Sequence, residues 1–266
     1  MDTAALNALI LPVVSAPYAN LDEVIQSFAK LEEAFLAAQD RRAVFASAYL
    51  AVTRSLKGKL GTNLFLDDIW VISYALAFAN LYRDALQNFA NGHRELVPKA
   101  WCLSFDVSMN DEGYVILDLL LGINAHINHD LPLALSSASI DPDRNKRHQD
   151  HVKVNDVLAE AINPIEDRIS QLYAPGFVFF DDILGPLDEK ITNFSIDHAR
   201  DFAWTNALAL ANASDDIERQ TQSHLIDTQS AVLANLIITP SAAFPWFKEL
   251  MRFLERKRSW LDLWQV

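Results

Sequence analysis

A histidine and an aspartate four residues apart are the side chains of this sequence best placed to share one chemical task. His126 and Asp130 lie in the segment Asn124-Ala-His126-Ile-Asn-His129-Asp130-Leu-Pro132. On a helix they would be about 40° apart, on a stripe of leucine and isoleucine side chains that should face the core. Imidazole and carboxylate groups are ligands that zinc and iron accept, so this pair predicts a divalent metal site.

The burial expected for this carboxylate leaves two interpretations open. A buried carboxylate must be paired or must bind a cation, because leaving it bare costs several kcal/mol. Pro132 adds a local defect, since it has no N–H to donate to the carbonyl of Asn128. The alternative to a metal is that Asp130 pairs with His126 or with an arginine and has a structural role only.

The next predicted helix carries further candidate ligands. If this helix and the next form an antiparallel hairpin about residue 141, His151 and Asn155 come to lie opposite the first pair. Metal-competent side chains on facing helices are how sites in helical bundles are generally built. We therefore expect His126, Asp130 and His151 to be the metal ligands.

Three more polar residues are candidates for a catalytic role beside that metal. Asp84 lies on the face of another predicted helix that also carries Trp70 and Tyr74, so it should point inward. The alternative for Asp84 is an inward carboxylate paired with an arginine. Asn124 and Asn155 complete the set, one on each of the two facing helices.

A cluster of cations begins the helix that carries His151. Arg144 and Arg147 flank Lys146 there, and positive charges at a helix N-terminus oppose the helix dipole. Together with the N–H groups of that helix end, they would bind an anionic part of a ligand. The alternative is a solvated turn in which neighbouring aspartates already neutralise the cluster.

The composition bounds the partners and the compartment. The formal net charge of −13 disfavours non-specific binding to nucleic acid or to an acidic membrane surface. Cys102 is the only cysteine, so neither an intramolecular disulfide nor a cysteine zinc motif is expected. The apolar stretch over residues 6–14 is too short for a membrane span and lacks the positive start of a signal peptide. These features predict a cytoplasmic protein that acts on a small molecule.

Hydrophobic periodicity and capping signals predict an all-α fold in one domain. Only 7 glycines in 266 residues leave few sites for tight hairpins, which disfavours β structure. We expect a bundle of about eight helices with negligible strand. Residues 1–19 would be an N-terminal extension, 20–212 the core bundle, and 213–266 C-terminal helices packed on it. The expected helices cover residues 20–39, 41–57, 65–89, 114–137, 145–173, 195–212, 214 onward and 244–258, with a long loop over 93–113 and a short broken segment over 179–192.

The sequence contains two segments of distinctive pattern, Phe78-Ala-Asn-Leu-Tyr82-Arg-Asp84-Ala-Leu and the His126 segment quoted above. They resemble a bacterial family described only as a domain of unknown function, over about residues 43–207. More distantly, the spacing of His126 and Asp130 in a helical chain is similar to zinc phospholipases C and single-strand-specific nucleases. That similarity implies metal ions in a helical domain and hydrolysis of phosphoesters. Those enzymes are secreted and use an N-terminal tryptophan as a metal ligand, whereas this chain begins with Met1 and a stretch free of tryptophan.

Three functional interpretations follow from these residues. The first is a metal-dependent hydrolase in which a metal-bound water is the nucleophile. The second is a non-haem iron oxidase or oxygenase on the same ligands, although the chain lacks the paired E-x-x-H motifs of di-iron bundles. The third is a non-catalytic helical binding protein in which the His/Asp cluster is structural.

Overall fold

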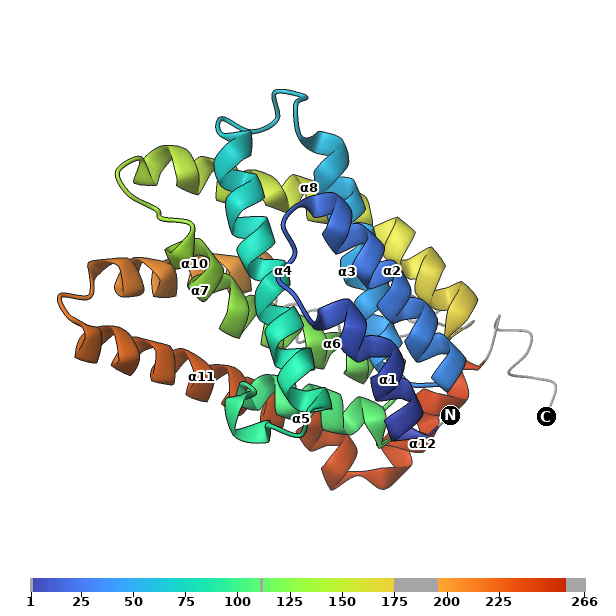
Figure 1. Ribbon diagram of the computed structural model, residues 1–266. Helices are drawn as coiled ribbons and strands as arrows, with labels where there is room; N and C mark the ends of the chain where they lie inside the picture. Colours follow the sequence, from blue (N-terminus) through green and yellow to red (C-terminus); the bar gives the residue numbers. More distant parts are fainter. Residues whose placement is uncertain (1, 111, 175–195, 257–266) are drawn as a thin grey trace.

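Helices make up every regular element of the residues that the structure describes, which are 2–110, 112–174 and 196–256 of a computed structural model (Figure 1). The predicted all-α class is confirmed for these residues. A 3₁₀ turn, η1, spans Arg94–Leu96, and a π-helical turn, η2, spans Ala125–Asp130. The α-helices are α1 Thr3–Val14, α2 Leu21–Ala38, α3 Arg42–Lys59, α4 Asp68–Ala90, α5 Lys99–Met109, α6 Val115–Asn124, α7 Leu131–Ser137, α8 Arg144–Leu172, α10 Ile196–Asn212, α11 Asp216–Ala243 and α12 Pro245–Glu255.

Capping side chains begin two of the long helices close to where the sequence predicts. At α2, the Asn20 side chain accepts the Glu23 N–H at 3.0 Å. At α11, for which a helix was expected from residue 214 onward, the N-cap is Asp215, and its side chain accepts the Glu218 N–H at 2.8 Å. Each cap satisfies a donor that the first turn of a helix leaves unpaired, which is why these starts can be located from sequence.

Two stretches in which no helix was predicted are helical. α1 lies within the predicted N-terminal extension, and its Leu6, Ile10 and Val14 are buried where α1 packs on α2 and α4. α5 lies within residues 93–113, so the prediction of a long loop there is wrong. Pro98 stands immediately before α5, where a missing N–H costs no intrahelical hydrogen bond. The proline marks a helix start rather than a break.

The predicted helix over residues 114–137 is interrupted by the π-helical turn. Within it, the Leu131 N–H donates to the His126 carbonyl, five residues earlier. Pro132 follows in the first turn of α7 and cannot donate to the Asn128 carbonyl. Single π turns inside α-helices are frequent at functional sites. This one contains the histidine and the aspartate singled out in the sequence.

Gly122 allows α6 to lie close to α3. A Cβ at this position would lie 2.5 Å from Cδ2 of Phe45, closer than real Cβ atoms approach their neighbours. The Phe45 ring is itself buried and meets the Trp101 ring edge-on, so it has little room to move. The absence of a side chain at Gly122 therefore sets the distance between α3 and the helix that leads into η2.

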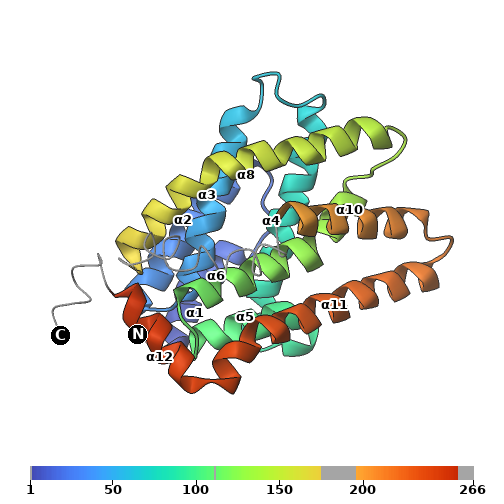
Figure 2. The same cartoon turned by 180° about the vertical axis from the view of Figure 1, so that it is seen from behind.

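The arrangement of the helices in space differs from the predicted hairpin. α8 packs mainly along α3, whereas α7 packs against α10 and α4. Figure 2 shows α8 alongside α3, with α10 and then α11 below it. The prediction that residues 145–173 pair with residues 114–137 is therefore wrong, because α10 takes the place beside α7. The predicted segment over 179–192 lies outside the described residues.

Two large clusters of buried apolar side chains stabilise the bundle. One joins helices α1, α2, α3, α4 and α5 around Phe28 and Trp101, and the other joins α4, α7, α8 and α10 around Trp70 and Trp204.

Among the described helices, none is by itself long and apolar enough to cross a membrane. α11 and α12 pass that test of length and composition together, with a bend of 96° between them.

Candidate functional site

Asp130 is the centre of a buried hydrogen-bonded cluster. Its Oδ2 lies 3.0 Å from His126 Nδ1, and its Oδ1 lies 2.8 Å from His129 Nδ1. The Trp101 Nε1–H donates to Oδ2 at 2.8 Å. All four residues are buried. The carboxylate is therefore surrounded by ring nitrogens that can donate to it, as a buried negative charge requires.

The electrostatics of this cluster favour an ionised Asp130 and a neutral His126. Burial by itself raises the pKa of Asp130, but the hydrogen bonds from His126 and His129 outweigh it, so this pKa lies below its ordinary value. Burial lowers the pKa of His126, although Asp130 opposes the shift. A neutral His126 facing an ionised carboxylate carries its proton on Nδ1, which leaves Nε2 as an acceptor.

The His126 imidazole is enclosed by aromatic rings. The Phe78 ring stacks on it with the ring centroids 3.4 Å apart, and the Tyr49 ring meets it edge-on at 4.7 Å. Within the described part of the chain, the His126 Nε2 atom is buried without a hydrogen-bond partner. An unpaired buried acceptor costs about 1–3 kcal/mol, so this atom is a candidate contact for a ligand.

A largely apolar cavity of about 420 Å³ lies against His126. Its walls come from α3, α4, α8 and α10, together with the end of α6 and η2. Among the described helices, α8 packs mainly on α3 and does not pack closely on α6 or η2, so a space remains between them. Pockets that hold small molecules usually measure about 300–1,000 Å³. The apolar lining includes Phe45, Tyr49, Phe78, Ile123, Leu158 and Ile162.

Arg200 of α10 lines the same cavity and is buried. Its Nε–H donates to Asn155 Oδ1 at 2.7 Å, and its Nη2–H donates to the His151 carbonyl at 2.7 Å. In return, His151 Nε2 lies 3.1 Å from the Arg200 carbonyl oxygen, to which it donates. The Tyr74 hydroxyl lies near the guanidinium but has no hydrogen bond of ordinary geometry to any described residue. These contacts join α8 to α10 at one end of the cavity.

The structure does not bring the three predicted metal ligands together. His126 and Asp130 are in contact, but His151 belongs to the Arg200 cluster and donates there. Both Asp130 oxygens already accept hydrogen bonds, and the two neighbouring histidines turn their Nδ1 atoms toward that carboxylate. Across the described residues, no group of three or more His, Cys, Asp or Glu side chains is placed to hold a metal ion. The donor set of these residues does not fit the predicted site.

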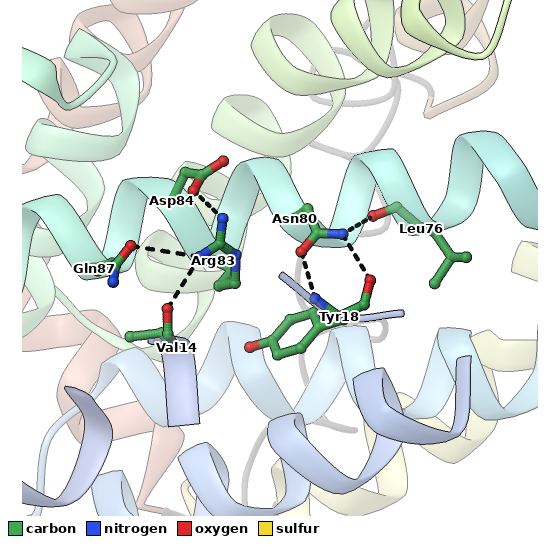
Figure 3. Close-up of polar contacts among 7 residues, drawn as sticks. All are labelled: Val14, Tyr18, Leu76, Asn80, Arg83, Asp84 and Gln87. Atoms are coloured by element: carbon green, nitrogen blue, oxygen red, sulfur yellow. Dashed lines mark hydrogen bonds and ion pairs between the residues drawn. The ribbon is translucent and has the colours of Figure 1, made fainter. Parts of the chain in front are cut away.

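Asp84 does not point into the core as predicted. Its side chain is 50% exposed and pairs with Arg83 of the same helix (Figure 3). Burial raises the pKa of Asp84, Arg83 opposes that shift, and the charge of Asp130 adds to it. Arg83 also donates to the Val14 carbonyl at 3.2 Å and so ties α4 to α1. The buried stripe of α4 passes through Tyr82 and Arg83, which leaves Asp84 at the edge of the core.

The two predicted asparagines have different positions. Asn124 Nδ2–H donates to the Ser230 carbonyl at 2.9 Å, and Asn124 Oδ1 accepts the Asn128 Nδ2–H at 3.1 Å. Asn124 therefore ties α6 and η2 to α11 and does not line the cavity. Asn155 does line the cavity, where it orients Arg200.

The cations at the start of α8 are used by the turn that precedes it. Arg144 makes a two-bond pair with Asp141, at 2.6 and 2.9 Å, and Arg147 donates to the carbonyls of Ser139 and Asp141. Lys146 lies 3.5 Å from Asp67. These contacts support the alternative of a solvated turn neutralised by its own aspartates, and not the predicted anion site.

Three residues that the sequence prediction left out belong to the buried clusters. His129 stands next to Asp130 in the quoted segment and contacts its second oxygen. Trp101 falls in the predicted loop, although a buried indole N–H usually needs an acceptor. Arg200 interrupts the apolar stripe of α10, and a cation in such a stripe is the signal by which it could have been found.

The fold and the site define an all-helical protein with a buried His/Asp cluster beside an apolar cavity. The chain belongs to a family of unknown function, DUF5995, which matches residues 21–240. This confirms the predicted resemblance to a family without a known activity, and the match covers the Asp130 cluster and the cavity. A search of curated proteins and a search of solved structures find no match. The distant similarity to zinc phospholipases C and nucleases is not confirmed.

Proposed function

We propose that this protein binds a predominantly apolar small molecule in the cavity between α3, α8 and α10. This is the third interpretation above, a helical binding protein whose His126–Asp130 pair is structural. The observation that carries it is the cavity, about 420 Å³ with mostly apolar walls. Ile162 on its α8 wall is 48% exposed, and apolar surface gathered in an open concavity is typical of a binding site.

Two unpaired polar atoms next to this cavity support the same proposal. Among the described residues, His126 Nε2 and the Tyr74 hydroxyl are buried without hydrogen-bond partners, and both residues line the cavity. Small-molecule sites typically combine apolar walls with a few polar groups that fix the orientation of the ligand. A ligand that pairs with these atoms would remove a penalty of about 1–3 kcal/mol for each.

The two metal-dependent interpretations have less support. They require His151 to give up its hydrogen bond to the Arg200 carbonyl and to move toward Asp130. They also require Asp130 to lose hydrogen bonds that now stabilise the buried charge of its carboxylate. Binding of an apolar molecule requires neither change.

The proposal is tested by titrating the protein with 1,6-diphenylhexatriene, a neutral hydrocarbon dye whose emission rises in apolar surroundings. We expect saturable binding to the wild-type protein. Ala159→Trp introduces an indole on the α8 wall of the cavity. It should lower the affinity for the dye at least about tenfold, because the new side chain occupies the ligand's space.

Asn163→Trp is the matched control. Asn163 is exposed on the same helix but does not line the cavity, so this variant should bind the dye like wild type. Circular dichroism of both variants checks that the helices are intact. If wild type shows no saturable binding, or if Ala159→Trp binds as tightly as Asn163→Trp, the proposal is wrong.

A further inference from the structure

We infer that the ligand of this cavity carries one carboxylate group, which pairs with Arg200. The inference rests on the proposed function and adds the chemical class of the ligand, an apolar body with a single negative end. It follows from the position of a buried guanidinium and an unpaired tyrosine hydroxyl on otherwise apolar walls.

Arg200 differs from the other buried arginines in its partners. Arg42 is buried beside Asp40 at 2.7 Å, and Arg83 is buried beside Asp84. Arg200 is 3% exposed, yet the described part of the chain places no carboxylate within 4.0 Å of it. A buried charge is normally paired, because its desolvation is otherwise uncompensated.

The nearest negative charges do not replace such a partner. Asp197 and Asp201 act on Arg200 from its own helix, but both side chains are exposed to water. Water screens exposed charges and weakens their effect on a buried group. The acceptors that Arg200 does contact, Asn155 Oδ1 and the His151 carbonyl, are neutral.

The donors that remain match the shape of a carboxylate. An arginine side chain has five N–H groups in a planar fork. At Arg200, the hydrogen bonds to described residues use only the Nε and Nη2 atoms. The remaining nitrogen, Nη1, and the nearby Tyr74 hydroxyl supply two donors. Two adjacent donors are what the two oxygens of a carboxylate accept.

The charges around the cavity limit the ligand to a single negative group. Arg200 is the one cation among the described residues that line it. One carboxylate can pair with this cation, whereas a second negative group on the ligand would have no cation to pair with among these lining residues.

The test compares decanoate with 1-decanol as competitors of 1,6-diphenylhexatriene at about pH 8, where the acid is ionised. We expect decanoate to displace the dye at concentrations about tenfold lower than decanol, because only decanoate forms the charge-assisted pair. Arg200→Gln should abolish this preference. Tyr74→Phe should reduce the preference at least about threefold, since it removes one donor.

Tyr82→Phe is the matched control, because Tyr82 is a second buried tyrosine whose hydroxyl has no partner among the described residues and does not line the cavity. It should keep the wild-type preference. Tyr74→Phe remains decisive if Arg200→Gln does not fold, since it removes only an unpaired hydroxyl. Equal displacement by the two competitors, or a preference that survives the Arg200 and Tyr74 substitutions, overturns the carboxylate and leaves the binding function standing. Failure of wild type to bind the dye overturns both.

Discussion

Asp130 and Arg200 show two ways in which this protein accommodates a buried charge. The charge of Asp130 is stabilised within the chain by hydrogen bonds to Trp101, His126 and His129. Among the described residues, the acceptors that Arg200 contacts are all neutral, and Arg200 borders a cavity. This difference is the reason why we propose a structural role for Asp130 and a binding role for Arg200.

At the residue scale, we predict that Asp130→Asn destabilises the protein strongly. The amide has one acceptor oxygen where the carboxylate has two, so its NH2 group would face buried donors that now have an acceptor. The expected loss is about 1–3 kcal/mol in the free energy of unfolding for each donor that loses its acceptor. Denaturation in urea measures it. Trp101→Phe removes one donor only and should cost about 1–3 kcal/mol.

A chelator separates this structural role from a metal site. If Asp130 has only protein partners, EDTA leaves the urea midpoint of wild type and of Asp130→Asn unchanged. A fall in the wild-type midpoint with EDTA, absent from the variant, would instead support the metal-dependent interpretations and contradict the structural one.

At the scale of the elements, the close contact of α6 with α3 decides where η2 lies. We predict that Gly122→Ala lowers the free energy of unfolding by about 1–3 kcal/mol, because the new methyl group would lie 2.5 Å from the buried Phe45 ring. The same shift would displace His126, whose ring centroid is 5.4 Å from that of Phe45. Gly122→Ala should therefore lower both the free energy of unfolding, measured by urea denaturation, and the affinity for diphenylhexatriene, measured by titration.

Gly58→Ala in α3 provides the comparison for this substitution. A Cβ added at Gly58 meets nothing within 4 Å, so alanine should stabilise the helix by about 0.5–1 kcal/mol. The two glycine substitutions are thus expected to have opposite signs. If Gly122→Ala is as well tolerated as Gly58→Ala, α3 and α6 do not pack as described.

At the scale of the whole molecule, the titrating groups predict how stability depends on pH. Burial lowers the pKa of His126 below 6.5, and burial together with the Arg200 charge lowers that of His151 well below it. The unfolded chain then binds more protons than the folded one below pH 6.5. Each histidine therefore reduces the free energy of unfolding as the pH falls, by about 1.4 kcal/mol per pH unit.

Glu255 acts in the opposite direction over the same range. Burial raises its pKa from 4.5 to about 7, although its Oε1 accepts the Ile116 N–H at 3.2 Å. The folded protein holds this proton more tightly, so Glu255 reduces stability as the pH rises from 4.5 to 7. It offsets part of the effect of the histidines.

Glu255→Gln should therefore increase the slope of stability against pH between about 5 and 7, and should stabilise the protein by up to about 3 kcal/mol at pH 8. Urea denaturation of both proteins at several pH values measures the difference. Parallel curves for wild type and Glu255→Gln would contradict the assignment of a raised pKa to this carboxyl group.

The local sequence determined the helices of this protein and one of its buried contacts. Capping side chains such as Asn20 and the spacing of apolar residues act within one or two turns, so they can be recognised without knowing what lies beside them. The contact of His126 with Asp130 is equally local, because both belong to one turn of chain. The exception is α5, which lies in the predicted loop and begins directly after Pro98.

Only the tertiary structure decided which helices lie side by side. α8 packs on α3, and α10 takes the place beside α7, although the connection from α7 to α8 is short enough for a hairpin. That choice placed His151 with Arg200 instead of with Asp130, and it left the apolar cavity along α8. Pairing of helices depends on burying the apolar faces of all of them at once, and no single segment carries that information.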